Sequence, residues 1–195
     1  MSPIRILGIA GSLRRGSHNL SLLRAAAQSL PPGVELDIYD GLAALPHYNE
    51  DLDVEPAPHE VARLRDAVAS ADGLLIATPE YNGTIPGVLK NAIDWASRPF
   101  PGNALQGKPV AVIGASTSLF GAVWSQAEAR KSLQIAGADV LQGEVPVGMA
   151  HEAFSSEGRL SEPELHGALD ELVGVLVARA GAAADNTRID VQRAA

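Results

Sequence analysis

Hydroxyl, guanidinium and amide groups gather in one short segment, Gly11 to Asn19, which follows an apolar run and precedes a helical pattern. The free N–H groups at a helix N-terminus attract phosphate, and these side chains add further donors. A phosphate site is therefore predicted from Ser12, Arg14, Ser17 and Asn19. The alternative is that Ser17 only caps the helix and that the arginines are solvated.

A second segment, Pro79 to Thr84, follows another apolar run. It combines a rigid proline, an aromatic ring, an amide and a glycine that permits close backbone approach, which suits a flat polar ring as ligand. The residues concerned are Pro79, Tyr81, Asn82 and Gly83, and Glu80 is the only acid in this proposed pocket. The alternative is a proline and glycine turn before a capped helix, with Tyr81 half-buried.

The first segment departs from the two familiar glycine fingerprints. Its Gly11 to Arg14 stretch is not G-x-G-x-x-G, and no Gly-Lys-Ser/Thr follows. These departures argue against a dinucleotide site of the Rossmann type and against a P-loop nucleotidase. A mononucleotide remains as the predicted ligand.

Continuous apolar runs and helical patterns alternate along the chain, which predicts an α/β fold with a doubly wound parallel sheet. The predicted strands cover residues 4–9, 34–39, 74–78, 110–113 and 140–147, the last interrupted near Gly143. The predicted helices cover residues 19–30, 61–71, 86–97, 124–136 and 162–180. In such a sheet the loops after the first, third and fourth strands meet at one edge, so both segments fall there. Residues 40–58 form a loop outside this alternation, and 182–195 are predicted to be a disordered tail.

The composition excludes several classes of protein. A chain of 195 residues with 46% apolar content and no cysteine can bury a core as one domain without disulfides, and it has no thiol chemistry. The net charge of −8 gives no general attraction to nucleic acid or to anionic membranes. Five histidines show no metal-ligand spacing, and no Gly-x-Ser-x-Gly motif is present, so neither a metal site nor a nucleophilic hydrolase is predicted.

No apolar run reaches the ~18 residues of a membrane span, so no membrane insertion is predicted. The first residues, Met1 to Arg5, lead directly into the first predicted strand rather than into an apolar signal region. We therefore expect a soluble, cytoplasmic protein.

The two segments resemble those of the NAD(P)H-dependent FMN reductases, a flavodoxin-like group that includes quinone, chromate and azo-dye reductases. The resemblance covers most of residues 4–180 and is strongest over Pro79 to Trp95. It implies a three-layer flavodoxin-like domain over residues 1–181, with a five-stranded sheet of order 2-1-3-4-5. By this resemblance the phosphate of FMN is held by Ser12, Arg14, Ser17 and Asn19. The isoalloxazine ring is lined by Pro79, Glu80, Tyr81, Asn82 and Gly83.

Two further segments resemble parts of the family less closely. Where family members have a glycine-rich turn, this chain has mostly hydroxyl residues between Ala115 and Gly121, and we expect Ser116 and Thr117 to face the ring edge. Residues 45–52 resemble a loop near a subunit interface, which implies a homodimer or homotetramer. The alternative for that loop is a solvated acidic segment covering the second strand.

The function implied is an FMN-dependent NAD(P)H oxidoreductase. Hydride would pass from NADPH or NADH to FMN, and electrons would then pass to quinones or to similar small acceptors such as chromate, azo or nitro compounds. Because the cofactor carries the chemistry, no catalytic side chain is nominated and ping-pong kinetics are expected. A flavodoxin-type FMN electron carrier reduced by a partner protein is one alternative, and a non-catalytic domain that has lost its flavin is another.

Overall fold

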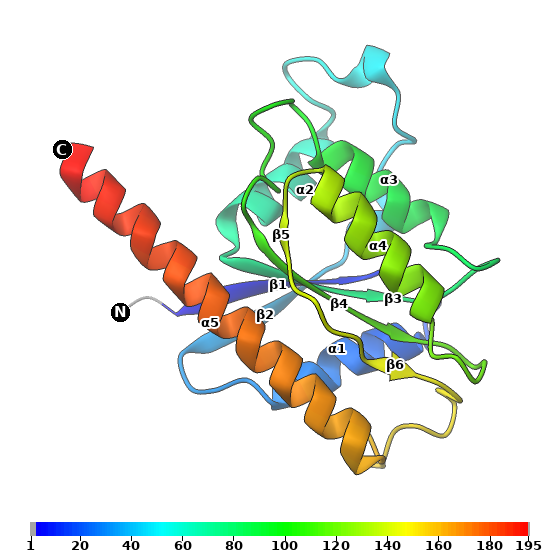
Figure 1. Cartoon of the computed structure of the whole chain (residues 1–195). Coiled ribbons are helices and arrows are strands. Elements are labelled where there is room, and N and C mark those ends of the chain that lie inside the picture. Colours follow the sequence, from blue (N-terminus) through cyan, green and yellow to red (C-terminus); the bar gives the residue numbers. More distant parts are fainter. Residues whose placement is uncertain (1–2, 195) are drawn as a thin grey trace.

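A parallel sheet forms the centre of the molecule in the computed structural model, which describes residues 3–194. Its strand order is β2-β1-β3-β4-β5, and β6 also pairs with β4 (Figure 1). The strands are β1 (Ile4–Ala10), β2 (Val34–Tyr39), β3 (Gly73–Thr78), β4 (Pro109–Ala115), β5 (Asp139–Val140) and β6 (Pro146–Val147). The predicted flavodoxin-like order 2-1-3-4-5 is confirmed.

The last strand position is divided into two short pieces, β5 and β6, which pair with opposite ends of β4. The interruption predicted near Gly143 is present. A Cβ added at Gly143 would lie 2.9 Å from Leu172 Cδ1, and the Gly143 carbonyl accepts a hydrogen bond from Arg130 Nη1 at 3.1 Å. This carbonyl therefore bonds a side chain instead of a neighbouring strand.

Helices cover both faces of the sheet. On one face lie α1 (His18–Gln28) and α5 (Pro163–Ala194), whose apolar residues share a buried cluster with one side of the strands. On the other lie α2 (His59–Ser70), α3 (Gly87–Ala96) and α4 (Val123–Ile135), which form a second cluster. The two clusters explain why β3 and β4 are buried along their whole length and read as continuous apolar runs.

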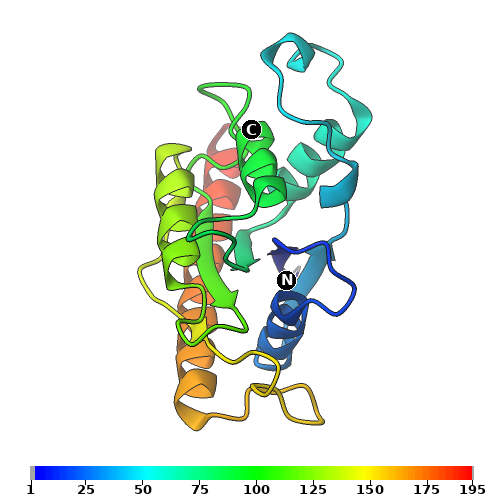
Figure 2. The same cartoon turned by 90° about the vertical axis from the view of Figure 1, so that its right-hand side faces the viewer.

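The segment 40–58 contains two 3₁₀ turns, Leu42–Ala44 and Glu50–Leu52, and stands away from the body of the molecule (Figure 2, cyan). It is held at several points, including the buried Leu42 and Leu45 and an ion pair of 2.7 Å between Asp53 and Arg65. Pro46 O accepts hydrogen bonds from Asn91 Nδ2 at 2.9 Å and from Trp95 Nε1 at 2.8 Å. Tyr48 packs against the same tryptophan, with ring centroids 4.9 Å apart. The segment is therefore positioned in part by α3, through the fully buried Trp95.

Helix α5 is longer than the predicted helix over residues 162–180. It runs to Ala194, so its backbone includes residues 182–194, where the sequence predicts a disordered tail. Alanines at 182–184 favour continuation of the helix because alanine has the highest helix propensity. Figure 1 shows this end of α5 extending beyond the sheet. Within the described residues, no helix combines the length and apolar character needed to cross a membrane.

Candidate functional site

A cavity of about 210 Å³ lies at the carboxyl ends of β1, β3 and β4. It brings together most of the residues that the sequence predicts for the site. Its lining consists of Ser12, Arg14, Ser17, His18, Asn19, Pro79, Glu80, Tyr81, Ala115, Ser116 and Thr117. Asn82 and Gly83 are absent from this lining, whereas His18 and Ala115 belong to it without having been predicted.

The first wall is the loop between β1 and α1. Ser17 is the N-cap of α1, and its hydroxyl oxygen accepts a hydrogen bond from Leu20 N at 3.2 Å. Capping leaves the hydroxyl hydrogen free to donate toward a ligand. The loop backbone is fixed at its start, where Gly11 N donates to Ala77 O at 2.8 Å. Ser12 and Arg14 lie between these two fixed points and line the cavity.

Asn19, predicted as a phosphate donor, lines the cavity and also makes two hydrogen bonds to the backbone of β4. Its Nδ2 donates to Ala115 O at 2.9 Å, and its Oδ1 accepts from Ala115 N at 3.0 Å. The side chain is nearly inaccessible, at 2% exposure. Asn19 therefore joins the start of α1 to the end of β4 and sets the distance between two walls of the cavity.

The second wall is the segment after β3, which closes into a tight hairpin. Tyr81 N donates to Thr84 O at 3.1 Å, and Thr84 N donates to Tyr81 O at 3.3 Å. The two residues between them have positive φ, 55° at Asn82 and 75° at Gly83, as a type I′ turn requires. Asn82 and Gly83 thus shape the turn, while Tyr81 lines the cavity with half of its surface exposed.

Glu80 is tied to the start of α4. Its carboxylate accepts a hydrogen bond from Ser125 N at 3.2 Å, and the helix N-terminus favours this negative charge. The Ser125 hydroxyl also lies 2.8 Å from both Thr78 Oγ1 and Pro79 O. The acid of the cavity is therefore a structural anchor for the Pro79 to Thr84 segment.

The third wall is the loop after β4. Ser116 lies at its base, where its N–H donates to Val147 O and its carbonyl accepts from Ala150 N, both at 3.0 Å. The glycine requirement of the loop is concentrated at Gly121, whose φ is 57° and where an added Cβ would lie 2.2 Å from the Pro146 carbonyl carbon. Ser116 and Thr117 both line the cavity.

His18 is the cavity residue with a perturbed titration. Partial burial and the positive charges of Arg14 and His151 lower its pKa below the ordinary value of 6.5. This histidine is assigned no role in the site from the sequence alone. Its position immediately after the N-cap Ser17 was the available signal for a place beside the anion site.

Comparison with known proteins agrees with this geometry. Residues 4–152 match the family described as NADPH-dependent FMN reductase. The chain belongs to this family. An NAD(P)H-dependent FMN reductase of Pseudomonas aeruginosa is 45% identical over 158 residues, which are 80% of this chain and 84% of that protein. A quinone reductase of Escherichia coli is 34% identical over 178 residues, 90% of this chain and 93% of that one.

A solved structure shows the same fold. The flavoenzyme FerB of Paracoccus denitrificans, an NAD(P)H:(acceptor) oxidoreductase, superposes with a TM-score of 0.80 and 34% identity, covering 91% of this chain and 97% of that chain. The present chain is accordingly an FMN-dependent NAD(P)H oxidoreductase.

The residues of this reductase fit FMN. Hydroxyl, guanidinium and imidazole groups lie together at the start of α1, where a phosphate is favoured. Glu80, the acid of the cavity, accepts a hydrogen bond from Ser125 N at the start of α4. Tyr81 and Pro79 offer flat apolar surface on the opposite wall. Among the described residues, no three His, Asp or Glu side chains are grouped closely enough to hold a metal ion.

Exposed apolar side chains occur in the segments that form or adjoin the walls of the cavity. We use the term apolar rim for Leu13, Tyr81, Leu119, Phe120, Trp124 and Met149, each of which is an exposed large hydrophobic residue. Phe120 and Trp124 contact each other edge to face, with ring centroids 5.2 Å apart. The loop after β4 also contacts the segment after β6, since Met149 N donates to Ser118 O at 2.9 Å. The rim residues come from segments that adjoin all three walls of the cavity.

Proposed function

We propose that this reductase transfers electrons from NAD(P)H to quinones or to similar small planar acceptors. The apolar rim is the observation that carries this proposal. Trp124 is 50% exposed and immediately precedes Ser125, which is bonded to Glu80 of the cavity. Exposed aromatic surface beside a flavin site suits a flat, weakly polar acceptor. The quinone reductases among the relatives support the same class of acceptor.

For the cofactor, we propose that Ser12, Arg14 and Ser17 bind the FMN phosphate. Arg14 supplies the positive charge, and the N-terminus of α1 supplies oriented N–H dipoles. Asn19 acts by holding α1 against β4, so that these donors stay aligned with the third wall.

On the ring side, we propose that Pro79, Glu80 and Tyr81 form one border and Ser116 and Thr117 the other, with Asn82 and Gly83 fixing the turn that presents Tyr81. Bound FMN supplies the hydride-accepting and electron-donating chemistry. The protein side chains orient the ring and limit access of water, and no side-chain acid or base is assigned.

We further propose that residues 1–181 are the FMN-binding domain and that the chain forms a homodimer or homotetramer. The projecting segment 40–58 supports an assembly, since it exposes Leu52 and Val54 away from the core. We propose the cytoplasm as its compartment, because reduced nicotinamide nucleotides are available there.

The proposal is tested with the purified full-length protein and 1,4-benzoquinone. The protein should be yellow and should release FMN on denaturation. It should oxidise NADPH rapidly only when quinone is added, with ping-pong kinetics. An FMN-containing protein with negligible turnover in the absence of a partner reductase would instead be an electron carrier. A protein that neither contains nor binds FMN would contradict the cofactor assignment.

The role of the apolar rim is tested with Trp124→Ala. Loss of one aromatic contact should raise the KM for benzoquinone roughly 2- to 10-fold while FMN retention stays unchanged. Ile135→Ala is the matched control, because Ile135 is an exposed apolar residue at the opposite end of α4. Equal KM values for the two variants would remove Trp124 from the acceptor surface.

A further inference from the structure

His18 occupies a distinctive place in the cavity. It is the first residue of α1, directly after the N-cap Ser17, and it lines the cavity together with Ser12 and Arg14. The imidazole is thus grouped with the hydroxyl and guanidinium donors on the wall formed by the start of the helix. This is the wall where a phosphate is electrostatically favoured.

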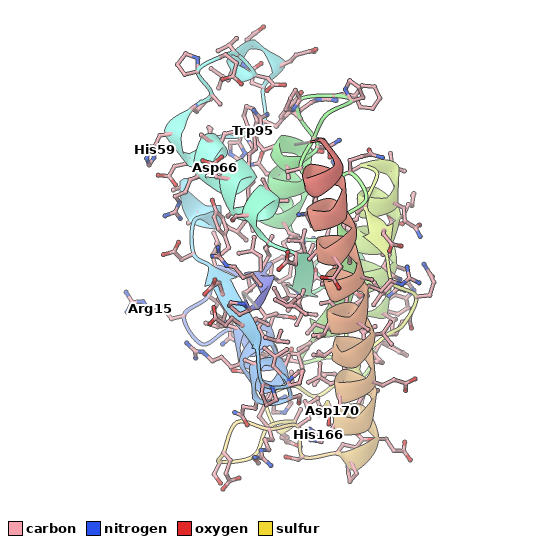
Figure 3. All side chains as sticks on the ribbon, turned by 90° about the vertical axis from the view of Figure 1, so that its left-hand side faces the viewer. Arg15, His59, Asp66, Trp95, His166 and Asp170 are labelled. Carbon is pink, nitrogen blue, oxygen red and sulfur yellow. The ribbon has the colours of Figure 1, made fainter. Side chains whose placement is uncertain are left out.

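The charged groups around His18 make this part of the cavity positive. Arg14 acts on it from the preceding loop and His151 from the segment after β6, and both disfavour the imidazolium. His151 lies 3.3 Å from the exposed Glu152 carboxylate. Glu80, on the opposite wall, is bonded to Ser125 N, and Arg15 points outward from the molecule (Figure 3). Partial burial and these charges together lower the pKa of the His18 imidazole in the flavin-free protein.

We propose that His18 is a further FMN-binding residue of this chain, which becomes protonated when the phosphate binds and donates a hydrogen bond to a phosphate oxygen. The proton comes from solvent, and no covalent bond changes. A phosphate dianion placed among Arg14, His18 and the start of α1 reverses the local sign of the field, so the imidazolium is stabilised. This inference rests on the proposed phosphate site.

The proposal has a definite pH signature. If His18 takes up a proton on binding, its contribution to FMN affinity is present at low pH and is lost as the pH rises through the pKa that it has in the complex. The phosphate itself loses a second proton near pH 6, and this ionisation strengthens FMN binding as the pH rises. A comparison of variants cancels this second effect, because it is common to all of them.

The experiment measures the dissociation constant of FMN from flavin fluorescence at pH 6 to 8 for the full-length protein and for His18→Gln. Glutamine keeps an amide donor but does not titrate. The variant should bind FMN about tenfold more weakly at pH 6 and less than about twofold more weakly at pH 8. Riboflavin, which lacks the phosphate, should bind equally to both proteins at every pH.

The matched control is His59→Gln. His59 is also the first residue of a helix, but its side chain is 86% exposed and pairs with Glu60. The FMN dissociation constant of His59→Gln should equal that of the unaltered protein from pH 6 to pH 8. A pH-independent loss in His18→Gln, or an equal loss for riboflavin, would overturn the proposal. Failure of the unaltered protein to bind FMN would instead contradict the proposed function itself.

A second readout does not depend on the variant. The His18 imidazole should titrate at a higher pH in the FMN-loaded protein than in the flavin-free protein when followed by NMR. An unchanged or lower titration midpoint on loading would refute protonation on binding.

Discussion

The two loops that the sequence singles out are both attached to other elements, but only the second also closes on itself. The Gly11 to Asn19 loop is fixed from outside, because Asn19 bonds the backbone of β4. The Pro79 to Thr84 segment is attached to α4 through Ser125, and it also closes on itself through the Tyr81 and Thr84 pair. Consequently the first loop leaves Arg14 without an ion-pair partner among the described residues, whereas the second uses Asn82 and Gly83 to shape its own backbone. We therefore expect Arg14 to serve the proposed phosphate site, whereas Asn82 and Gly83 set the backbone geometry of the second loop.

The largest effect is expected for Asn19→Ala, which removes the attachment of the first loop to β4. Two buried backbone groups of Ala115 would lose their partners, so the free energy of unfolding should fall by about 3 kcal/mol. Urea denaturation measures this directly. Asn49→Ala is the control, since Asn49 accepts a single bond, from Asp51 N, in an exposed turn. Unchanged stability with a selective loss of FMN over riboflavin would show that Asn19 is instead a phosphate ligand.

A smaller effect, on binding rather than stability, is expected for Arg14→Ala. Loss of one charge-assisted contact should weaken FMN affinity about 30-fold, corresponding to roughly 2 kcal/mol, with little change in thermal stability. Arg15→Ala is the matched control because the neighbouring side chain points away from the molecule (Figure 3). Riboflavin affinity should not change in either variant. Equal FMN affinities for the two variants would exclude Arg14 from the phosphate site.

Local pattern was sufficient to predict the doubly wound α/β fold, the edge of the sheet where the site lies and most of the cavity lining, and the family resemblance supplied the strand order. The continuous apolar runs of β3 and β4 identify the buried centre, and the helix start after Ser17 identifies the anion wall. The partners of Asn19 and Glu80 could not be predicted in this way. Asn19 bonds a residue 96 positions away, and Glu80 bonds one 45 positions away. Such pairs depend on how α1 and α4 pack against the sheet.

The smallest effect is expected for Asn82→Gly, which tests whether the second loop serves geometry alone. Asn82 has φ of 55°, a conformation that glycine adopts without steric cost, so stability should change by less than about 0.5 kcal/mol. FMN affinity should also be retained, because the turn that presents Tyr81 is preserved.

Replacing the glycine of the same turn by alanine should have a larger effect on stability than Asn82→Gly. Gly83→Ala places a Cβ at φ of 75° and should cost about 1 kcal/mol in unfolding free energy, although nothing lies within 4 Å of the added atom. The cost is therefore conformational rather than steric crowding by neighbours. If Asn82→Gly instead weakened FMN and riboflavin equally at unchanged stability, the Asn82 amide would contact the flavin ring, and both loops would bind ligand through their side chains.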